Sequence, residues 1–398
     1  CRRMKATLLD VTRLLDRRLQ RRLPTGIDRV SLEYVRHFGP RSTALVHLAG
    51  QWIELSANDS ARLFGGLLSE PADSRRFNAL IVWLVARALP RSTCVRLSSS
   101  RFLLNTGHAG LEQARYAHFL HRSPLRPVFF VHDLIPLSYP EYCRPGESTR
   151  HRIRMQTVLS TGHAVILNSQ ATLDAMRHYA AEHHQPMPPA VVAPLAPPQW
   201  PRADSHPPLR PPYFVMLGTI EPRKNHWLIL HVWRQLIERM GAAAPRLLVV
   251  GQHGWECENV VDMLERCEVL RGFVFERPGC SDAELATCLQ HAQALLFPSF
   301  AEGYGMPLVE ALALGLPVIA SDLPAFREIG ATVPEYVDPL DGRRWADLIV
   351  DYASPESPCR RAQLQRLESF VAPTWPAHFA QVEALLERLD NLRGQYTN

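Results

Sequence analysis

Two glutamates enclose a short glycine-containing loop, and their spacing is the strongest chemical signal in the 398-residue sequence. Glu302 and Glu310 are eight positions apart, with Gly303 and Gly305 between them. The apolar run Leu295–Phe297 predicts a strand before the loop, and a helix is expected to begin just after it. Because the first N–H groups of a helix are unpaired and its N-terminus is electropositive, such a loop is an anion site. A diphosphate would fit, since hydroxyls of the sugars at its two ends can donate hydrogen bonds to the two carboxylates.

A second interpretation of the same glutamates is purely structural. Carboxylates near a helix N-terminus stabilise the helix whether or not a ligand binds. The glycines between them favour the ligand interpretation, because glycine lets a bound group approach the backbone closely. We therefore expect the loop itself to contact the ligand, through Gly303, Tyr304, Gly305 and Met306.

A second polar cluster, GTIEPRKNH (Gly218 to His226), directly follows the predicted strand Phe214–Leu217. Arg223 and Lys224 fall in this strand-to-helix turn. In a parallel sheet such turns open on one edge, so we expect these cations beside Glu302. They would neutralise phosphate oxygens, and above all the charge that develops on a departing diphosphate. The alternative is a pair of solvated loop cations.

Short apolar runs alternate with helix-length amphipathic segments along the whole chain, a pattern typical of parallel sheets covered on both faces. The expected fold class is therefore α/β, with doubly wound Rossmann-like domains. Helices are predicted over Trp227–Arg239 and Asp282–Ala292, the latter with Ser281 and Glu284 as a capping box. Residues 50–125 give no clear boundaries. The predicted strands are Thr7–Val11, Ala44–Leu48, Val128–Val131, Ala164–Leu167, Val191–Val192, Phe214–Leu217, Leu247–Val250, Val274–Phe275, Leu295–Phe297 and Val318–Ala320.

Length and composition set the domain organisation. With 46% apolar and 21% charged residues, the chain is a globular protein of two or three domains. Eleven of the 33 prolines lie within 186–212. Since proline-rich segments are semi-rigid, this stretch is expected to join two domains and to limit their closure. The domains predicted on either side are 1–200 and 201–372.

The formal net charge of +5 is too small to indicate a nucleic-acid partner. Residues 1–24 nevertheless hold eight basic and two acidic residues. This N-terminus is either a solvated helix face or a surface that contacts anionic lipid or phosphorylated substrate. The eight cysteines show no metal or disulfide spacing, and no apolar run approaches the length of a spanning helix. We expect a cytoplasmic protein, peripheral on the inner membrane face.

Several motifs resemble family 4 glycosyltransferases, which are retaining enzymes of the GT-B fold. In the second half these are GTIEPRKN, PGCSDAEL and PSFAEGYGMPLVEALALGLPVIASD. In the first half, TGIDRV, FFVHDLIPL and ILNSQAT follow in the order that the family shows. The resemblance implies two Rossmann-like domains facing each other across a cleft. It also implies that residues 373–398, around Trp375 and Phe379–Leu389, form a helix that crosses back to the first domain.

The resemblance also assigns roles to the candidate residues. Glu302 would lie near the transferred sugar and Glu310 on the nucleotide ribose. Lys224, with Arg223, would hold the diphosphate, while His132 of the HD motif would face the donor sugar. The remaining candidates are Gly218, Thr219 and Gly303 to Met306 on the donor side, and Thr25 and Gly26 in a loop near phosphate or acceptor.

Two of these assignments carry an alternative. Taken alone, His132 is more typical of a core or strand-end histidine. Asp133 beside it at a predicted strand terminus favours a site residue, and Asp133 would either orient the imidazole or cap the next segment. His108 is a weaker candidate of the same kind. Many family members have arginine where this chain has Thr219, and Arg223 is expected to compensate.

The predicted function is retaining transfer of a hexosyl group from a nucleoside-diphosphate sugar, with GDP-mannose as the first donor to test. The acceptor would be a saccharide or lipid-linked saccharide in bacterial surface polysaccharide or lipopolysaccharide synthesis. Because the chain has no D-x-D motif, we expect metal-independent transfer and no cofactor. The alternatives are a sugar-nucleotide 2-epimerase of the same architecture and an inactive nucleotide-sugar-binding subunit. A dehydrogenase is disfavoured because no G-x-G-x-x-G follows an early strand.

Overall fold

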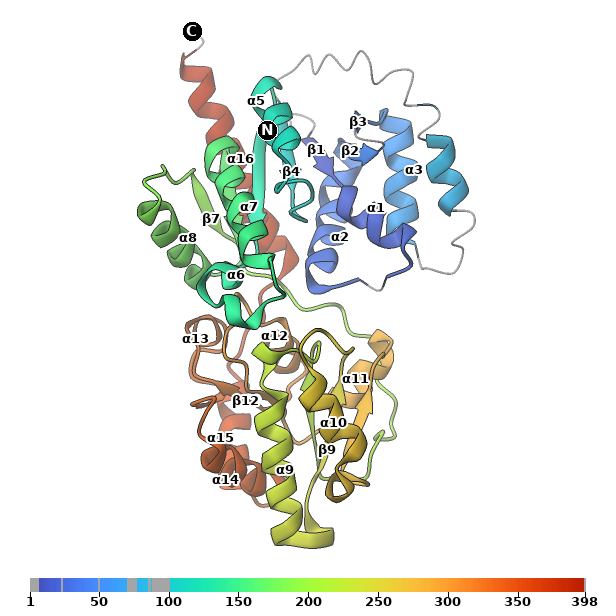
Figure 1. Ribbon diagram of the computed structural model, residues 1–398, viewed down its shortest axis with the longest axis vertical. Helices are drawn as coiled ribbons and strands as arrows, with labels where there is room; N and C mark the ends of the chain where they lie inside the picture. Colours follow the sequence, from blue (N-terminus) through green and yellow to red (C-terminus); the bar gives the residue numbers. More distant parts are fainter. Residues whose placement is uncertain are drawn as a thin grey trace. The chain divides into compact units, whose positions relative to one another are not determined.

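The computed structural model describes residues 7–22, 24–48, 51–69, 77–84, 87 and 101–396 (Figure 1). The chain divides into two compact units. The first unit comprises the chain up to Leu134, Thr149–Leu195 and the segment from Trp375, and the second comprises Ile135–Ser148 and Ala196–Thr374. Residues 135–148, which the sequence analysis placed inside the first domain, therefore belong to the second unit.

The first unit is built on a seven-stranded sheet in the order β3-β2-β1-β4-β5-β6-β7. Only the edge strand β3 is antiparallel to its neighbour, and the central strands are buried on both faces, as predicted for a doubly wound sheet. Strands β3 and β4 lie in the region that gave no sequence signal. The strands are β1 (Thr7–Asp10), β2 (Ser42–Leu48), β3 (Gln51–Glu54), β4 (Phe102–Asn105), β5 (Arg126–Val131), β6 (Ala164–Leu167) and β7 (Ala190–Val192).

Helices cover this sheet, and the first of them, α1, carries part of the basic N-terminus. In α1 the side chains of Leu14 and Leu15 are buried in the core, so they are not available to a lipid surface. Arg2, Arg3 and Lys5 lie outside the described residues. The main helices are α1 (Thr12–Leu19), α2 (Gly26–Phe38), α3 (Ala57–Leu68), α5 (Ala114–Arg122), α7 (Glu147–Thr161), α8 (Gln170–Glu182) and α16 (Trp375–Tyr396).

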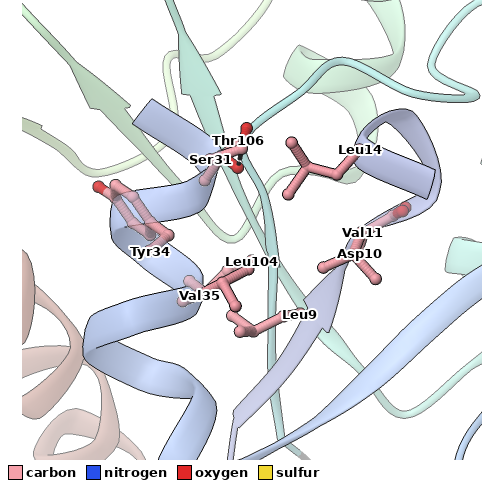
Figure 2. A pocket seen from close by; sticks show the side chains of 9 residues that line it. All are labelled: Leu9, Asp10, Val11, Leu14, Ser31, Tyr34, Val35, Leu104 and Thr106. Carbon is pink, nitrogen blue, oxygen red and sulfur yellow. Dashed lines mark hydrogen bonds between the residues drawn. The ribbon is translucent and has the colours of Figure 1, made fainter. Parts of the chain in front are cut away.

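A small cavity of about 10 Å³ lies between β1, β4 and α2 (Figure 2). This volume matches about one water molecule. Asp10, at its rim, is buried, and its carboxylate accepts hydrogen bonds from the Tyr116 hydroxyl at 2.8 Å and the Asn105 amide at 3.3 Å. Burial raises the pKa of Asp10, while its hydrogen-bond donors oppose the shift. The cavity is thus a packing feature with its polar group satisfied.

The second unit is built on a six-stranded, fully parallel sheet in the order β10-β9-β8-β11-β12-β13. Its strands are β8 (Tyr213–Leu217), β9 (Arg246–Val250), β10 (Val274–Arg277), β11 (Leu295–Phe297), β12 (Val318–Ser321) and β13 (Glu335–Val337). Its helices are α6 (Ile135–Ser138), α9 (His226–Met240), α10 (Glu258–Arg266), α11 (Asp282–Gln290), α12 (Met306–Ala313), α13 (Pro324–Gly330), α14 (Gly342–Ala353) and α15 (Pro358–Leu367). Helices α9 and α11, including the Ser281–Glu284 capping box, confirm the predicted ones.

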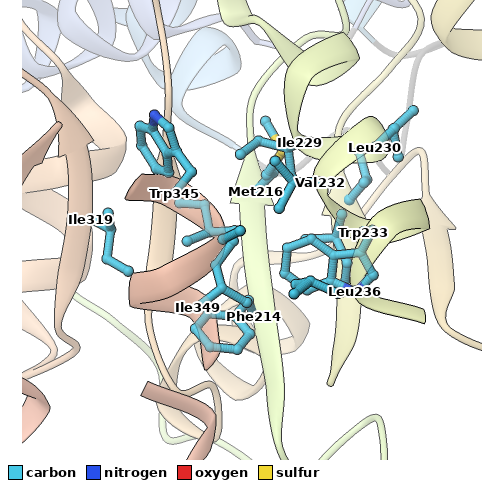
Figure 3. Packing of buried hydrophobic residues seen from close by; sticks show 14 of the residues in the cluster. Phe214, Met216, Ile229, Leu230, Val232, Trp233, Leu236, Ile319, Trp345 and Ile349 are labelled. Atoms are coloured by element: carbon cyan, nitrogen blue, oxygen red, sulfur yellow. The ribbon is translucent and has the colours of Figure 1, made fainter. Parts of the chain in front are cut away.

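Alternation along β8 separates two apolar cores, one on each face of the sheet. Phe214 and Met216 join Trp233 of α9 and Trp345 of α14 in one cluster (Figure 3). Tyr213 and Val215 point to the other face, where they pack with residues of α11 and α12. Successive side chains of a strand point to opposite faces of the sheet. Because both faces are buried here, the sequence run is uniformly apolar.

The proline-rich segment between β7 and β8 contains no helix or strand. Its second part lies against the second unit, because Trp200 and Leu209 pack on the apolar core there. The backbone N–H of Asp204 also donates to the hydroxyl of Thr287 at 2.9 Å. Among the described residues, no helix combines the length and apolar composition that crossing a membrane requires.

The C-terminal helix α16 returns to the first unit, as the resemblance implied. Phe379 packs edge-on against Tyr34 with ring centroids 5.2 Å apart. His378 is buried, and its Nδ1–H donates to the carbonyls of Ala193 and Pro194 at 3.0 and 3.1 Å. Its Nε2 accepts from the Tyr34 hydroxyl at 2.9 Å. These contacts hold the imidazole in its neutral form with the proton on Nδ1.

This arrangement predicts an acid-sensitive attachment of α16. Burial lowers the pKa of His378 to about 4, although its hydrogen bonds to the two carbonyls oppose the shift. Between the unfolded value near 6.5 and the folded value, the unfolded chain binds a proton that the folded chain does not, so stability falls as the pH falls through that window. His378→Asn removes this titration. We expect the free energy of unfolding of the variant to fall more slowly with decreasing pH than that of the wild type, by up to about 1.4 kcal/mol per pH unit.

Urea unfolding at several pH values between 4 and 7 measures the difference in slope. The same substitution at the exposed His118 on α5, His118→Asn, is the matched control. Equal slopes for His378→Asn and the wild type would contradict this role of His378.

Candidate functional site

Two neighbouring strands of the second unit bring the predicted glutamate and cations together. Strand β8 leads into a short turn, Pro222–Lys224, that precedes α9, and strand β11 leads into the loop before α12. β8 and β11 are adjacent in the sheet and parallel, so both turns open at its carboxyl edge. Arg223 and Lys224 lie beside Glu302, as predicted.

The carboxylate of Glu302 is held by both cations at once. Lys224 Nζ lies 2.5 Å from one carboxylate oxygen, and Arg223 lies 2.6 Å from the other. The side chains of Lys224 and Glu302 are 10% and 9% exposed, so this is a buried ion cluster rather than a surface pair. Arg223 also contacts Glu221 at 2.6 Å. The four side chains together carry two positive and two negative charges.

The electrostatics of the cluster follow from its burial. Burial alone would raise the pKa of the Glu302 carboxyl, but Arg223 and Lys224 outweigh this effect and lower it to about 2. Burial also raises the pKa of Glu221, against the attraction of the same cations. For Lys224, burial lowers the pKa, and Glu302 only partly restores it. At neutral pH Glu302 is thus ionised, with its charge fully matched by its two partners.

Backbone contacts fix the loop that carries Glu302. The N–H of Phe300 donates to the carbonyl of Arg223 at 2.9 Å, and Arg223 donates to the carbonyl of Ala301 at 2.8 Å. The hydroxyl of Ser299 donates to Glu302 at 2.9 Å. The two turns are therefore joined to each other by main-chain as well as side-chain contacts.

Segment 135–148 supports this loop from within the second unit, which sequence reasoning did not foresee. The ring of Tyr142 stacks on that of Phe300, with centroids 5.4 Å apart and planes at 8°. Trp255 donates from its ring nitrogen to the carbonyl of Tyr142 at 3.2 Å. The one available sequence signal is the density of aromatic residues just after the HD motif.

Glycine at position 305 is required by the backbone. Gly305 is the N-cap of α12 with φ +111°, a conformation that favours glycine. A Cβ there would lie 2.6 Å from the ring of Phe326. Gly218, with φ +136°, similarly lies under Lys224, whose Cε would be 3.4 Å from an added Cβ. Both glycines shape the edge on which the cations and the helix N-terminus meet.

The other donor-side candidates surround this edge with different exposure. Glu310 and Tyr304 are buried, at 8% and 5% exposure, and Glu310 lies on α12. Gly303 and Met306 are half-buried, and Thr219 is exposed. Of the two glutamates, Glu302 forms the ion pairs with Arg223 and Lys224, and Glu310 lies on the helix that follows the loop.

Two residues of the cation turn were missed by sequence reasoning. Glu221 belongs to the ion cluster and is 5% exposed. His226, the first residue of α9, is 3% exposed, and neither ring nitrogen has a hydrogen-bond partner. Burial lowers the pKa of His226 to about 3. Its sequence signal was only its place beside Lys224.

In the first unit, His132 follows β5 and is buried. Its Nε2–H donates to the carbonyl of Thr106 at 2.8 Å, and burial lowers its pKa to about 4. His108 lies beside it, with ring centroids 5.4 Å apart, and His151 is the third ring of this group. His132 is therefore neutral, with Nδ1 as the hydrogen-bond acceptor. No group of three or more potential metal ligands able to hold an ion occurs among the described residues.

Thr25 and Gly26 begin α2. Thr25 is the N-cap and forms a capping box with Asp28, which fixes the loop by itself. Asp28 is buried and also accepts ion pairs from Arg13 at 2.8 Å and Arg17 at 2.6 Å. A Cβ added at Gly26 would meet nothing within 4 Å, so packing does not explain the glycine.

The backbone of Gly305 yields a direct prediction. Gly305→Ala forces an L residue into a left-handed conformation and against Phe326, and we expect it to lower the free energy of unfolding by about 2–3 kcal/mol. Gly279→Ala is the matched control, since an added Cβ there meets nothing within 4 Å. Chemical denaturation compares the two, and equal stability of both variants would show that the loop geometry is wrong.

The sequence comparisons place this site in a known domain. Residues 211–354 match the family described as Glycosyl transferases group 1. The serotype-specific mannosyltransferase WbdA of Escherichia coli is 29% identical over 217 residues, which are 50% of this chain and 26% of WbdA. The O-antigen chain mannosyltransferase RfbU of Salmonella typhimurium is 31% identical over 140 residues, 34% of this chain and 37% of RfbU. The chain thus spans well under half the length of these curated relatives.

Solved structures extend the likeness of fold to nearly the whole chain. An α,α-trehalose 6-phosphate synthase from Burkholderia multivorans has a TM-score of 0.62 at 11% identity, covering 98% of this chain and 100% of its own. The Anabaena protein Alr3699/HepE, solved in complex with UDP, has a TM-score of 0.60 at 14% identity with the same coverage. Residues 211–354 are thus similar to the group 1 glycosyltransferases, and the two Rossmann-like units share their fold with these solved structures.

Proposed function

We propose that this chain transfers a hexosyl group from a nucleoside-diphosphate sugar to a saccharide acceptor in bacterial surface polysaccharide synthesis. The observation that carries the proposal is the buried cluster of Glu302, Arg223 and Lys224 at the edge where α12 begins. An anion site with two cations and a helix N-terminus suits a diphosphate. A carboxylate in the same cluster suits the sugar hydroxyls attached to it.

Binding of the donor would redistribute the charges of the cluster. The phosphates would take hydrogen bonds from Arg223 and Lys224, and the Glu302 carboxylate would turn from these cations to hydroxyls of the sugar. Glu310, eight positions further along, would accept hydrogen bonds from the ribose. The cations are thus held in place by Glu302 before the donor arrives, which avoids reorganisation during the reaction.

The proposed transfer retains the configuration of the sugar. The bond from the anomeric carbon to the diphosphate breaks while the acceptor hydroxyl attacks the same face, and its proton passes to the departing phosphate. Arg223, Lys224 and the N–H groups at the start of α12 would stabilise the charge of the leaving group. Glu302 would position the sugar without a covalent bond, and His132 would accept a hydrogen bond from it.

The names of the relatives favour a mannosyl donor, since WbdA and RfbU are mannosyltransferases. Alr3699/HepE was solved with UDP, so the nucleotide is best tested with both guanine and uracil. We propose a cytoplasmic location, because the described cysteines are free thiols, as suits a reducing compartment. Lipid contact through α1 would depend on its arginines and the half-buried Leu19, since Leu14 and Leu15 are buried.

Two substitutions in the cluster should shift nucleotide affinity in opposite directions. Lys224→Ala removes a cation and should weaken binding of a nucleoside diphosphate and cost about 100-fold or more in turnover. Glu302→Gln removes the competing carboxylate, so it should tighten binding of the same nucleoside diphosphate by about tenfold while turnover falls. Calorimetric titration with GDP and with UDP measures the affinities.

Arg234→Gln is the control, because Arg234 lies exposed on α9 and pairs with Glu238 on the surface. It should bind and turn over like the wild type. Wild-type turnover in Lys224→Ala, or no binding of either nucleotide by the wild type, would refute the proposed function. Product that forms without any acceptor would identify a 2-epimerase instead.

The proposal also predicts metal-independent transfer. Arg223 and Lys224 supply the positive charge that a divalent ion would otherwise bring to the diphosphate. Activity of the purified chain should therefore be unchanged in excess EDTA, measured as release of the nucleoside diphosphate. Loss of activity that Mg²⁺ restores would contradict this part of the mechanism.

A further inference from the structure

A cavity of about 280 Å³ lies entirely within the first unit, and the donor chemistry does not use it. We infer that it holds an anionic group of the acceptor, a phosphate or carboxylate attached to a saccharide. That this group belongs to an acceptor rests on the proposed function, whereas the binding of an anion does not. The charged residues that line the cavity are Arg13, Arg17, Arg22, Arg154, Asp16 and Glu112.

The position of the cavity in the fold is that of a binding site. The chain runs from β1 outward to β2 on one side and later returns to place β4 on the other side of β1. Ligands of doubly wound sheets bind at this switch point, beyond the carboxyl ends of the strands. Thr12 and Arg13, directly after β1, and Gly107–Gly110, just after β4, all line the cavity.

The charges lining the cavity favour an anion. Four arginines face two carboxylates, and one of the carboxylates, Glu112, pairs with Arg154 at 3.2 Å. The Nε atoms of Arg13 and Arg17 are bound by the buried Asp28, which lies outside the lining. With Asp28 counted, the group still has one more positive than negative charge. An excess of cations around a cavity raises the local concentration of anions.

The backbone around the cavity is shaped to admit these side chains. A Cβ at Gly107 would lie 2.8 Å from Cδ of Arg13, so only glycine leaves room for the arginine stem there. His108 has a φ of +59°, which is unusual for a residue with a side chain, and it is 7% exposed. Its Nε2–H donates to the carbonyl of Phe130 at 2.7 Å, which fixes the ring at the cavity wall.

His108 also brings the cavity close to His132. Its ring lies 5.4 Å from that of His132, the residue proposed to contact the donor sugar. An anion in the cavity would therefore anchor an acceptor whose hydroxyl lies near His132. The volume is slightly below the roughly 300 Å³ at which ligand pockets usually begin, which suits one sugar residue with its charged group.

The test compares anionic and neutral sugars in the presence of saturating nucleoside diphosphate, which occupies the donor site. The first probes are mannose 6-phosphate and methyl α-mannoside, titrated by calorimetry at low salt. We expect the phosphate to bind and the neutral glycoside to bind at least tenfold more weakly. Arg154→Gln should weaken binding of mannose 6-phosphate by about tenfold or more. Glu112→Gln should strengthen it, because Arg154 loses its competing partner.

Arg152→Gln is the matched control, since Arg152 is exposed on the same helix, α7, and does not line the cavity. It should bind like the wild type. Equal affinity of Arg154→Gln and Arg152→Gln, or equal binding of the neutral and phosphorylated sugars, would overturn the inference. The stability of each variant is checked by thermal unfolding, and Glu112→Gln tests the site even if Arg154→Gln fails to fold.

Further probes separate the sources of the anion. A uronic-acid disaccharide and a lipid-linked saccharide diphosphate in detergent micelles are titrated in the same way. The probe whose affinities rank the variants in the same order identifies the anionic group of the acceptor. Failure of all three anionic probes to bind the wild type would overturn the inference. If no nucleoside diphosphate binds but the order of variants holds, the proposed function fails while the anion site stands.

Discussion

The ion cluster of Glu302 with Arg223 and Lys224 is the constraint on which the rest of the site depends. A buried carboxylate is costly unless it is paired, and here each of its oxygens faces a cation within 2.6 Å. Glu302 in turn holds Arg223 and Lys224, which would otherwise repel each other, side by side at the edge of the sheet. With Glu221 counted, the cluster holds two positive and two negative charges, so it presents cations to a diphosphate without a large standing charge.

The surrounding fold holds the side chains of this ion cluster in position. Adjacent strands β8 and β11 set the two turns next to each other, and a main-chain hydrogen bond from Phe300 to Arg223 fixes their distance. Gly305 lets α12 begin where its N-terminus joins the same edge. The apolar clusters on both faces of the sheet make these strands rigid supports, and Tyr142 packs on Phe300 from segment 135–148.

Much of the second unit was predictable from sequence because its signals are local. Apolar runs on doubly buried strands, the Ser281 capping box and the glycine loop each act within a few residues. The contact of Lys224 with Glu302 spans 78 positions but followed from the rule that parallel strands share an edge. What sequence did not predict depends on distant packing. The return of 135–148 to the second unit, the burial of Leu14 and Leu15, and the cavity at the β1–β4 switch point are examples.

The decisive measurement for the diphosphate site is a crystal structure with a bound nucleoside diphosphate. We expect phosphate oxygens about 3 Å from Lys224 Nζ and the Arg223 guanidinium, with the N-terminus of α12 facing them and Glu302 released from at least one cation. A diphosphate bound elsewhere, with both contacts of Glu302 unchanged, would contradict it.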